Sequence, residues 1–160
     1  TTLDLSGFNT SSVTNMSGMF TGCSSLTVLN LSDLNASNVT SMEWMFHGCS
    51  ALTTINLSGL DTSSVTNMSE MFRECSALAS LDLSGLDTSN VTNMKQMFYD
   101  CSALASLDLG GLDTSSVTNM DDIFIGCQNL QTIYVKDMVS MNKFESEKPS
   151  SYNIDFIIKE

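Results

Sequence analysis

The sequence repeats itself every 26 residues, and this period constrains the fold more than any other feature. The cysteines mark the register without insertion or deletion: Cys23, Cys49, Cys75, Cys101 and Cys127. Valine, methionine, phenylalanine and leucine recur at the same spacing. One such unit is too short to bury its own apolar side, so a period of this length indicates units that stack on one another.

Each unit contains a short leucine-rich stretch, as in Leu26-Thr27-Val28-Leu29-Asn30-Leu31. Side chains alternate between the two faces of a strand, so Leu29 and Leu31 are predicted to point inward and Asn30 outward. This L-x-x-L-x-L pattern is typical of a leucine-rich repeat. From Met42 to Cys49 the apolar residues are spaced by three and four, which predicts a helical turn or two.

These patterns predict an α/β-type solenoid, a right-handed leucine-rich-repeat-like stack of about five to six coils with short parallel strands, short helical turns and a C-terminal cap. Residues 1–130 are assigned to the repeats, as a fragment of a longer array because the chain opens within a unit. Residues 131–160 are assigned to the last strand and the cap, because the pattern decays after Val135.

Charge excludes several classes of partner. The chain has 18 acidic and 6 basic residues and a net charge of -12. Phosphate binding needs clustered Lys and Arg, so we expect no nucleic acid partner. Anionic membrane surfaces are disfavoured for the same reason, and no apolar run is long enough for membrane insertion.

The unit at residues 81–104, L-D-L-S-G-L-D-T-S-N-V-T-N-M-x-x-M-F-x-x-C-S-x-L, resembles the 26-residue repeat of the BspA-like bacterial surface proteins. The resemblance covers about residues 1–135. It implies a leucine-rich-repeat-like fold, a cell-surface or extracellular location, and a role as an adhesin or interaction protein. It supplies no catalytic residues and no general ligand.

The cysteine and methionine columns favour core positions. Each Cys follows Phe by three residues and precedes Leu, where the pattern points inward, and a free Cys behaves as a small buried hydrophobe. Disulfides between adjacent coils are the alternative, because stacked Cα atoms would lie within the disulfide range. The methionines, spaced as on a helix and paired with Phe, favour core over an exposed binding groove.

Rows of Asp and Asn have two interpretations. As turn residues they accept hydrogen bonds from nearby backbone amides, which is the favoured interpretation. As a calcium site, the best cluster would be formed by four aspartates: Asp82, Asp87, Asp108 and Asp113. Another row, with Asn15, Asn67 and Asn93, is expected to form an internal amide ladder between coils.

Nothing in the sequence predicts an enzyme or a cofactor. His47 is the single histidine, and the chain has no G-x-S-x-G, P-loop or H-E-x-x-H motif.

Variation among the units indicates where a partner would bind. It concentrates in the Met-x-x-Met-Phe-x-x-Cys segment, and Trp, Arg and Tyr dominate interface energies. The candidate partner-binding residues are Trp44, His47, Arg73, Glu74, Lys95, Tyr99 and Asp122. The alternative surface is the outward face of the strands, with Asn56, Asp82, Asp108 and Tyr134.

We therefore expect a protein- or glycan-binding module that contacts a host or neighbouring-cell surface. A structural stalk or spacer, and the non-catalytic repeat region of a larger surface enzyme, are the alternatives. The oligomeric state is left open.

Overall fold

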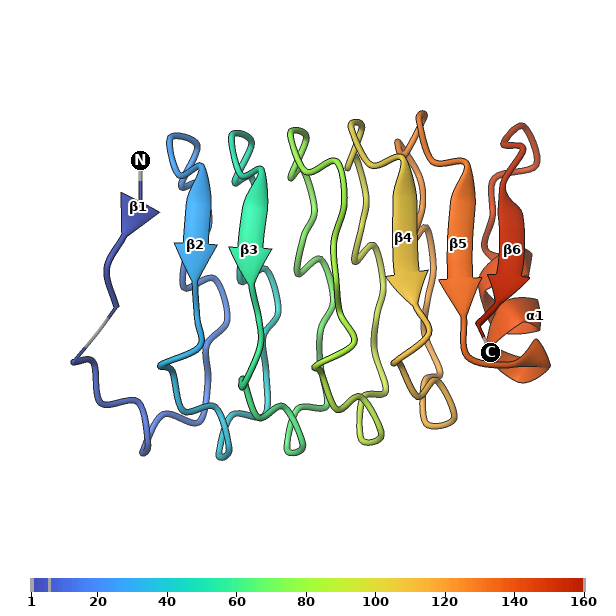
Figure 1. The fold of residues 1–160 in the computed structure, drawn as a ribbon. Coiled ribbons are helices and arrows are strands. Elements are labelled where there is room, and N and C mark those ends of the chain that lie inside the picture. Colours follow the sequence, from blue (N-terminus) through green and yellow to red (C-terminus); the bar gives the residue numbers. More distant parts are fainter. Residues whose placement is uncertain (1, 6, 160) are drawn as a thin grey trace.

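The computed structural model describes residues 2–5 and 7–159 as a row of stacked coils (Figure 1). The elements are β1 (Thr2–Leu3), β2 (Val28–Asn30), β3 (Thr54–Asn56), β4 (Ser106–Leu109), β5 (Thr132–Val135), α1 (Met138–Ser146) and β6 (Asp155–Ile158). All strand pairs are parallel, and Leu29 lies beside Ile55, 26 residues on. The predicted solenoid of short parallel strands is confirmed.

The strands form two sheets, β1-β2-β3 and β4-β5-β6. Between them, residues 80–82 contribute a single bridge, from Asp82 to Asp108, and in the described part of the chain they do not pair with β3. Residues 80–82 occupy the positions of Thr54–Asn56 in β3, and the same sequence, Ser-Leu-Asp, begins β4 at Ser106, so residue type does not explain the interruption. We call this interruption the seam.

The opposite side of the coils is continuous. Its bridges run from Asn15 through Ser41, Asn67 and Asn93 to Asn119, so the seam interrupts one side only.

The segments from Met to Cys are consecutive β-turns, so the predicted helical turns are wrong at this point. In coil two, the Met45 amide donates to the Met42 carbonyl (3.2 Å) and the Cys49 amide to the Phe46 carbonyl (3.0 Å). Trp44 and Gly48 have φ of 58° and 71°, in the left-handed region that ends a helix. Alternate amides instead donate to the next coil, as Trp44 does to Ser69 (3.1 Å).

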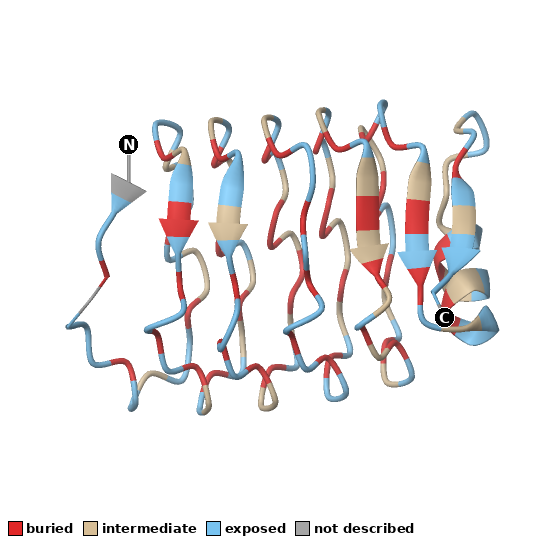
Figure 2. Cartoon of the chain, in the orientation of Figure 1, coloured by how far each residue is buried: buried red, intermediate tan, exposed pale blue. Residues whose placement is uncertain are grey.

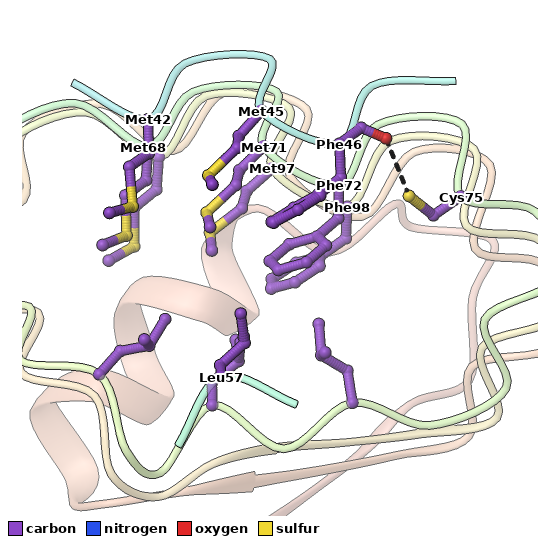
Figure 3. Packing of buried hydrophobic residues seen from close by; sticks show 14 of the residues in the cluster. Met42, Met45, Phe46, Leu57, Met68, Met71, Phe72, Cys75, Met97 and Phe98 are labelled. Carbon is purple, nitrogen blue, oxygen red and sulfur yellow. Dashed lines mark hydrogen bonds between the residues drawn. The ribbon is translucent and has the colours of Figure 1, made fainter. Parts of the chain in front are cut away.

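The core is a set of side-chain columns that run through the stack (Figure 3). Neighbouring rings of Phe20, Phe46, Phe72, Phe98 and Phe124 stack with centroids 5.3 to 6.3 Å apart. Methionines fill parallel columns beside them, and Met42 and Met68 are fully buried. The core interpretation of the methionines is confirmed for these positions, whereas Met19 in the first coil is 40% exposed. Figure 2 shows buried positions recurring from coil to coil.

The last residues pack on the final coil. Asp137 caps α1 by accepting a hydrogen bond from the Ser140 amide (2.8 Å). Phe144 is fully buried and extends the phenylalanine column, 5.9 Å from Phe124. β6 then pairs with β5, which adds a strand to the second sheet.

Candidate interaction surface

Arg73 is the centre of a side-chain network on the turn segments. Its Nη1 donates to Glu70 Oε2 (3.2 Å) and to Gln96 Oε1 (2.7 Å), and its Nε donates to Glu74 (3.4 Å). Its guanidinium carbon lies 4.4 Å from the ring centroid of Tyr99 on the next coil. Four partners fix one half-buried side chain, so this surface is held in one conformation before any partner arrives.

The network reaches coils on both sides. His47 Nε2 lies 3.6 Å from Glu74 Oε1, and Gln96 Nε2 donates to Asp122 Oδ2 (3.1 Å). Five of the seven predicted residues are thus connected: His47, Arg73, Glu74, Tyr99 and Asp122. Glu70 and Gln96 complete the connection but were not singled out as candidate residues. The spacing of Glu70 three residues before Arg73 was the available signal.

Trp44 lies in the same turn row as Glu70, one coil earlier. Its side chain is 44% exposed, and it is the only large exposed hydrophobic residue that the structure describes between Leu29 and Ile133. Lys95 occupies a neighbouring row and is half-buried. We refer to the seven predicted residues together with Glu70 and Gln96 as the turn surface.

Positive φ angles concentrate on this surface. The non-glycine residues in the left-handed region are Trp44, Glu70, Glu74, Gln96, Asp100 and Asp122. Equivalent positions in other coils hold Gly18, Gly22, Gly48 and Gly126, also with positive φ. A side chain in this region costs roughly 1–2 kcal/mol relative to the right-handed conformation, so these positions keep large side chains at an energetic cost.

A shallow groove of about 390 Å³ runs beside the turn surface across four coils. It is lined by Gly48, Ser50, Glu74, Ser76, Asp100, Ser102, Gly126 and Gln128. Gly126 is required by close packing at this point, since a Cβ there would lie 1.9 Å from Asp100 Oδ1 and 2.8 Å from Asp100 Cα.

The strand face carries the alternative candidate residues. Asn56 donates to Asn30 on the preceding coil (2.9 Å), and Asp108 is paired with Lys159. Tyr134 is 36% exposed. A cavity of about 270 Å³ brings together Ser80, Leu81, Asp82, Ser106, Asp108 and Tyr134.

The Asp and Asn rows form local turns. Asp87 Oδ1 accepts from the Ser89 amide (3.0 Å) and hydroxyl (2.7 Å), and these bonds lower the pKa of the Asp87 carboxyl. Asp61 and Asp113 have lowered pKa values for the same reason, from Ser63 and Ser115. Turn formation was therefore the correct interpretation. Among residues 2–5 and 7–159, no three His, Cys, Asp or Glu side chains form a group that could hold a metal ion, so the four aspartates of the calcium alternative are not gathered into a site.

The predicted amide ladder is wrong, because these Asn side chains also accept hydrogen bonds within their own turn. Asn67 Oδ1 accepts from the amide and hydroxyl of Ser69, two residues on, and Asn93 Oδ1 accepts from the Lys95 amide. Coil-to-coil bonds in this region come from the backbone and from serine and threonine hydroxyls, such as Thr66 Oγ1 to the Thr40 carbonyl (3.2 Å).

The cysteines are free, as the core interpretation predicted. Cys75 Sγ donates to the Phe46 carbonyl (3.2 Å) of the preceding coil, and Cys49, Cys101 and Cys127 repeat this contact. Burial raises the pKa of the Cys75 thiol to about 12. A thiol with so high a pKa is a poor nucleophile at neutral pH.

The sequence matches the family described as "Mycoplasma protein of unknown function, DUF285", over residues 1–105 and again over 51–154. The chain belongs to this family. Comparison with curated proteins gives no significant match.

Two solved leucine-rich repeat proteins resemble this DUF285 chain in fold. The T. pallidum leucine-rich repeat protein (TpLRR) has a TM-score of 0.53 and 23% identity over 75% of this chain and 50% of its own. A leucine-rich repeat protein from Bacteroides ovatus ATCC 8483 has a TM-score of 0.57 and 21% identity over 89% of this chain and 33% of its own. The chain thus spans half or less of these proteins, and the likeness confirms the predicted leucine-rich-repeat fold.

No helix in the described ranges is both long and apolar enough to cross a membrane.

Proposed function

We propose that this chain is a cell-surface or secreted interaction module, and that it binds a protein on a host or neighbouring cell through the turn surface. The observation that carries the proposal is Trp44, a half-exposed aromatic held at a backbone position that favours glycine. Gly18 occupies the equivalent place in the first coil. A costly conformation that retains an exposed Trp points to a role outside folding.

The neighbouring network supports the same surface. Trp, Arg and Tyr are the residue types that contribute most to binding energy, and here they lie on three successive coils. The contacts of Arg73 with Glu70, Gln96 and Tyr99 reduce the entropy that binding must remove.

Charge indicates the kind of partner. Glu70, Glu74, Asp100 and Asp122 lie in the same turn segments as Trp44 and Tyr99 or in the neighbouring ones, where carboxylates outnumber the basic Arg73 and Lys95. Complementary potentials speed association and select partners, so a basic patch around an apolar pocket fits this surface.

The decisive variant is Trp44→Gly, assayed against a panel of purified host matrix proteins and glycans. Loss of a central Trp weakens binding by about 30-fold or more. Stability stays within about 1 kcal/mol, because relief of the left-handed strain offsets the lost packing. Tyr134→Ala on the strand face is the matched control and leaves binding unchanged. A Trp44→Gly protein that is folded and binds its ligand like the wild type refutes the assignment.

The strand face is the second candidate, favoured by the cavity beside Tyr134. An aromatic ring next to the Ser106 hydroxyl and the Asp82 carboxylate suits a sugar better than a flat protein surface. In that case Tyr134→Ala abolishes glycan binding and Trp44→Gly does not.

A further inference from the structure

Among the described residues, no strand pairs with the outer edge of β6. β6 is the last strand of the sheet β4-β5-β6, and in Figure 1 it ends the row, with α1 behind it. Ile157 and Ile158 are 44% and 40% exposed. Unpaired backbone groups beside exposed apolar side chains form a template for another strand.

Hydrogen bonding to β5 determines which groups face the open edge. The Asp155 amide donates to Gln131 (2.8 Å) and the Lys159 amide to Val135 (2.9 Å). Backbone directions alternate along a strand, so Phe156 and Ile158 direct their N–H and C=O groups outward from the sheet. Ile157 is in register with Tyr134, which places its side chain, with those of Asp155 and Lys159, on the strand face.

We propose that β6 pairs antiparallel with the β6 of a second copy of this chain, around a two-fold axis at Ile157. This arrangement places Asp155 opposite Lys159 of the second copy, and it does so twice. Ile157 then lies opposite Ile157 of the second copy, and Phe156 lies opposite Ile158 of the second copy. Opposite charges across two strands stabilise the pair, and apolar pairs add to it.

The charges select this register. Moving the axis to Phe156 or Ile158 places an isoleucine opposite a charged residue and leaves the ion pairs unmade. A parallel pairing in register brings Asp155 beside Asp155, and like charges in that position are destabilising. The antiparallel pair is also closed by its two-fold axis, so it forms a dimer and not a fibre.

Lys159 changes partner in the dimer. In the single chain its Nζ contacts Asp108 of β4, two strands inward from the outer edge of β6. The Lys159 side chain is 54% exposed, so it can turn toward Asp155 of the second copy, and the new ion pair replaces the one with Asp108. The backbone bonds would come from Phe156 and Ile158, which join the two sheets into one. A single strand pair is a small interface, so the dimer is weak, with a Kd on the order of tens of micromolar.

Charge reversal tests the proposal by sedimentation velocity on the 160-residue chain. The wild type dimerises as concentration rises. Asp155→Lys and Lys159→Asp each raise the Kd about tenfold or more, because each puts two like-charge pairs into the dimer. The double variant Asp155→Lys/Lys159→Asp restores dimerisation. A wild type that stays monomeric to about 1 mM, or singles that dimerise unchanged, overturns the proposal.

Oxidative crosslinking tests the register, in a Cys23→Ala background that removes the half-buried native thiol. In Ile157→Cys, the introduced thiols of the two copies lie opposite each other in a non-hydrogen-bonded pair. Their Cα atoms are then about 4.5 Å apart, which is within the range for a disulfide. Ile158→Cys is the control, because position 158 of the second copy is more than about 7 Å away, too far for a disulfide. Crosslinking of Ile157→Cys alone supports the pairing. Equal crosslinking of both, or of Ile158→Cys alone, contradicts it. Neither test depends on the turn surface or its ligand.

Discussion

Phe72→Ala tests whether the columns of identical side chains hold the coils together. Phe72 is fully buried, and its ring stacks on Phe46 at 5.3 Å and on Phe98 at 6.1 Å. Truncating a buried Phe to Ala costs about 3–5 kcal/mol, and each lost ring pair accounts for about 0.5–1.5 kcal/mol of specific interaction. We expect a loss of about 4 kcal/mol, a large fraction of the usual 5–15 kcal/mol of a folded domain.

Urea unfolding followed by circular dichroism measures this loss. With a slope of about 2 kcal/mol/M, the midpoint falls by about 2 M. Each coil contacts only its neighbours, so the variant is also expected to unfold less cooperatively, because the coils on either side lose part of their coupling. Phe8→Ala is the control, since Phe8 is 61% exposed and should change stability little. A loss below about 1 kcal/mol for Phe72→Ala would show that the stacked columns do not govern stability.

Two further outcomes follow from the pKa values. Burial raises the pKa of Cys75 to about 12, so a thiol reagent at pH 8 should label the half-buried Cys23 of the native protein well before Cys75, and equal rates would contradict the buried column. Serine hydrogen bonds lower the pKa of Asp61, Asp87 and Asp113 below the usual value near 4, so their contribution to stability is complete above that pH and is lost as pH falls through the lowered pKa values. Replacing all three by Asn, which other coils carry in this row, should reduce the drop in urea midpoint between pH 7 and pH 3, and an unchanged drop would place the acid sensitivity elsewhere.

Periodicity was sufficient to predict the fold and most of the core. A fixed spacing makes equivalent residues neighbours, so Leu29 and Cys49 could be assigned inward positions from the pattern alone. It was not sufficient for the turn segments. Apolar residues spaced by three and four suit a helix, but they also suit consecutive turns with bonds between residues three apart. Gly48 was the visible sign of a left-handed position, and Trp44 concealed the other.

The candidate surface was predicted in part. Arg73 and Tyr99 are 26 residues apart, so the register alone puts them on adjacent coils, and the structure shows them in contact. The links through Glu70 and Gln96 depend on side-chain directions at left-handed residues, which the pattern does not specify. The seam was also beyond prediction, because residues 80–82 have the same sequence as residues 106–108, which form part of β4.

Because the seam interrupts one side only, the stack of coils should bend more easily there than elsewhere. Between β3 and residues 80–82 the strand side lacks the ladder found elsewhere, whereas Asn67 and Asn93 remain bridged behind it. The first three coils and the later ones are therefore joined by a continuous row of bridges on one side and lack strand pairing on the other. Flexing them apart breaks few bonds, so the stack should change its curvature at this joint when it meets a rounded or strained surface, while each half stays rigid.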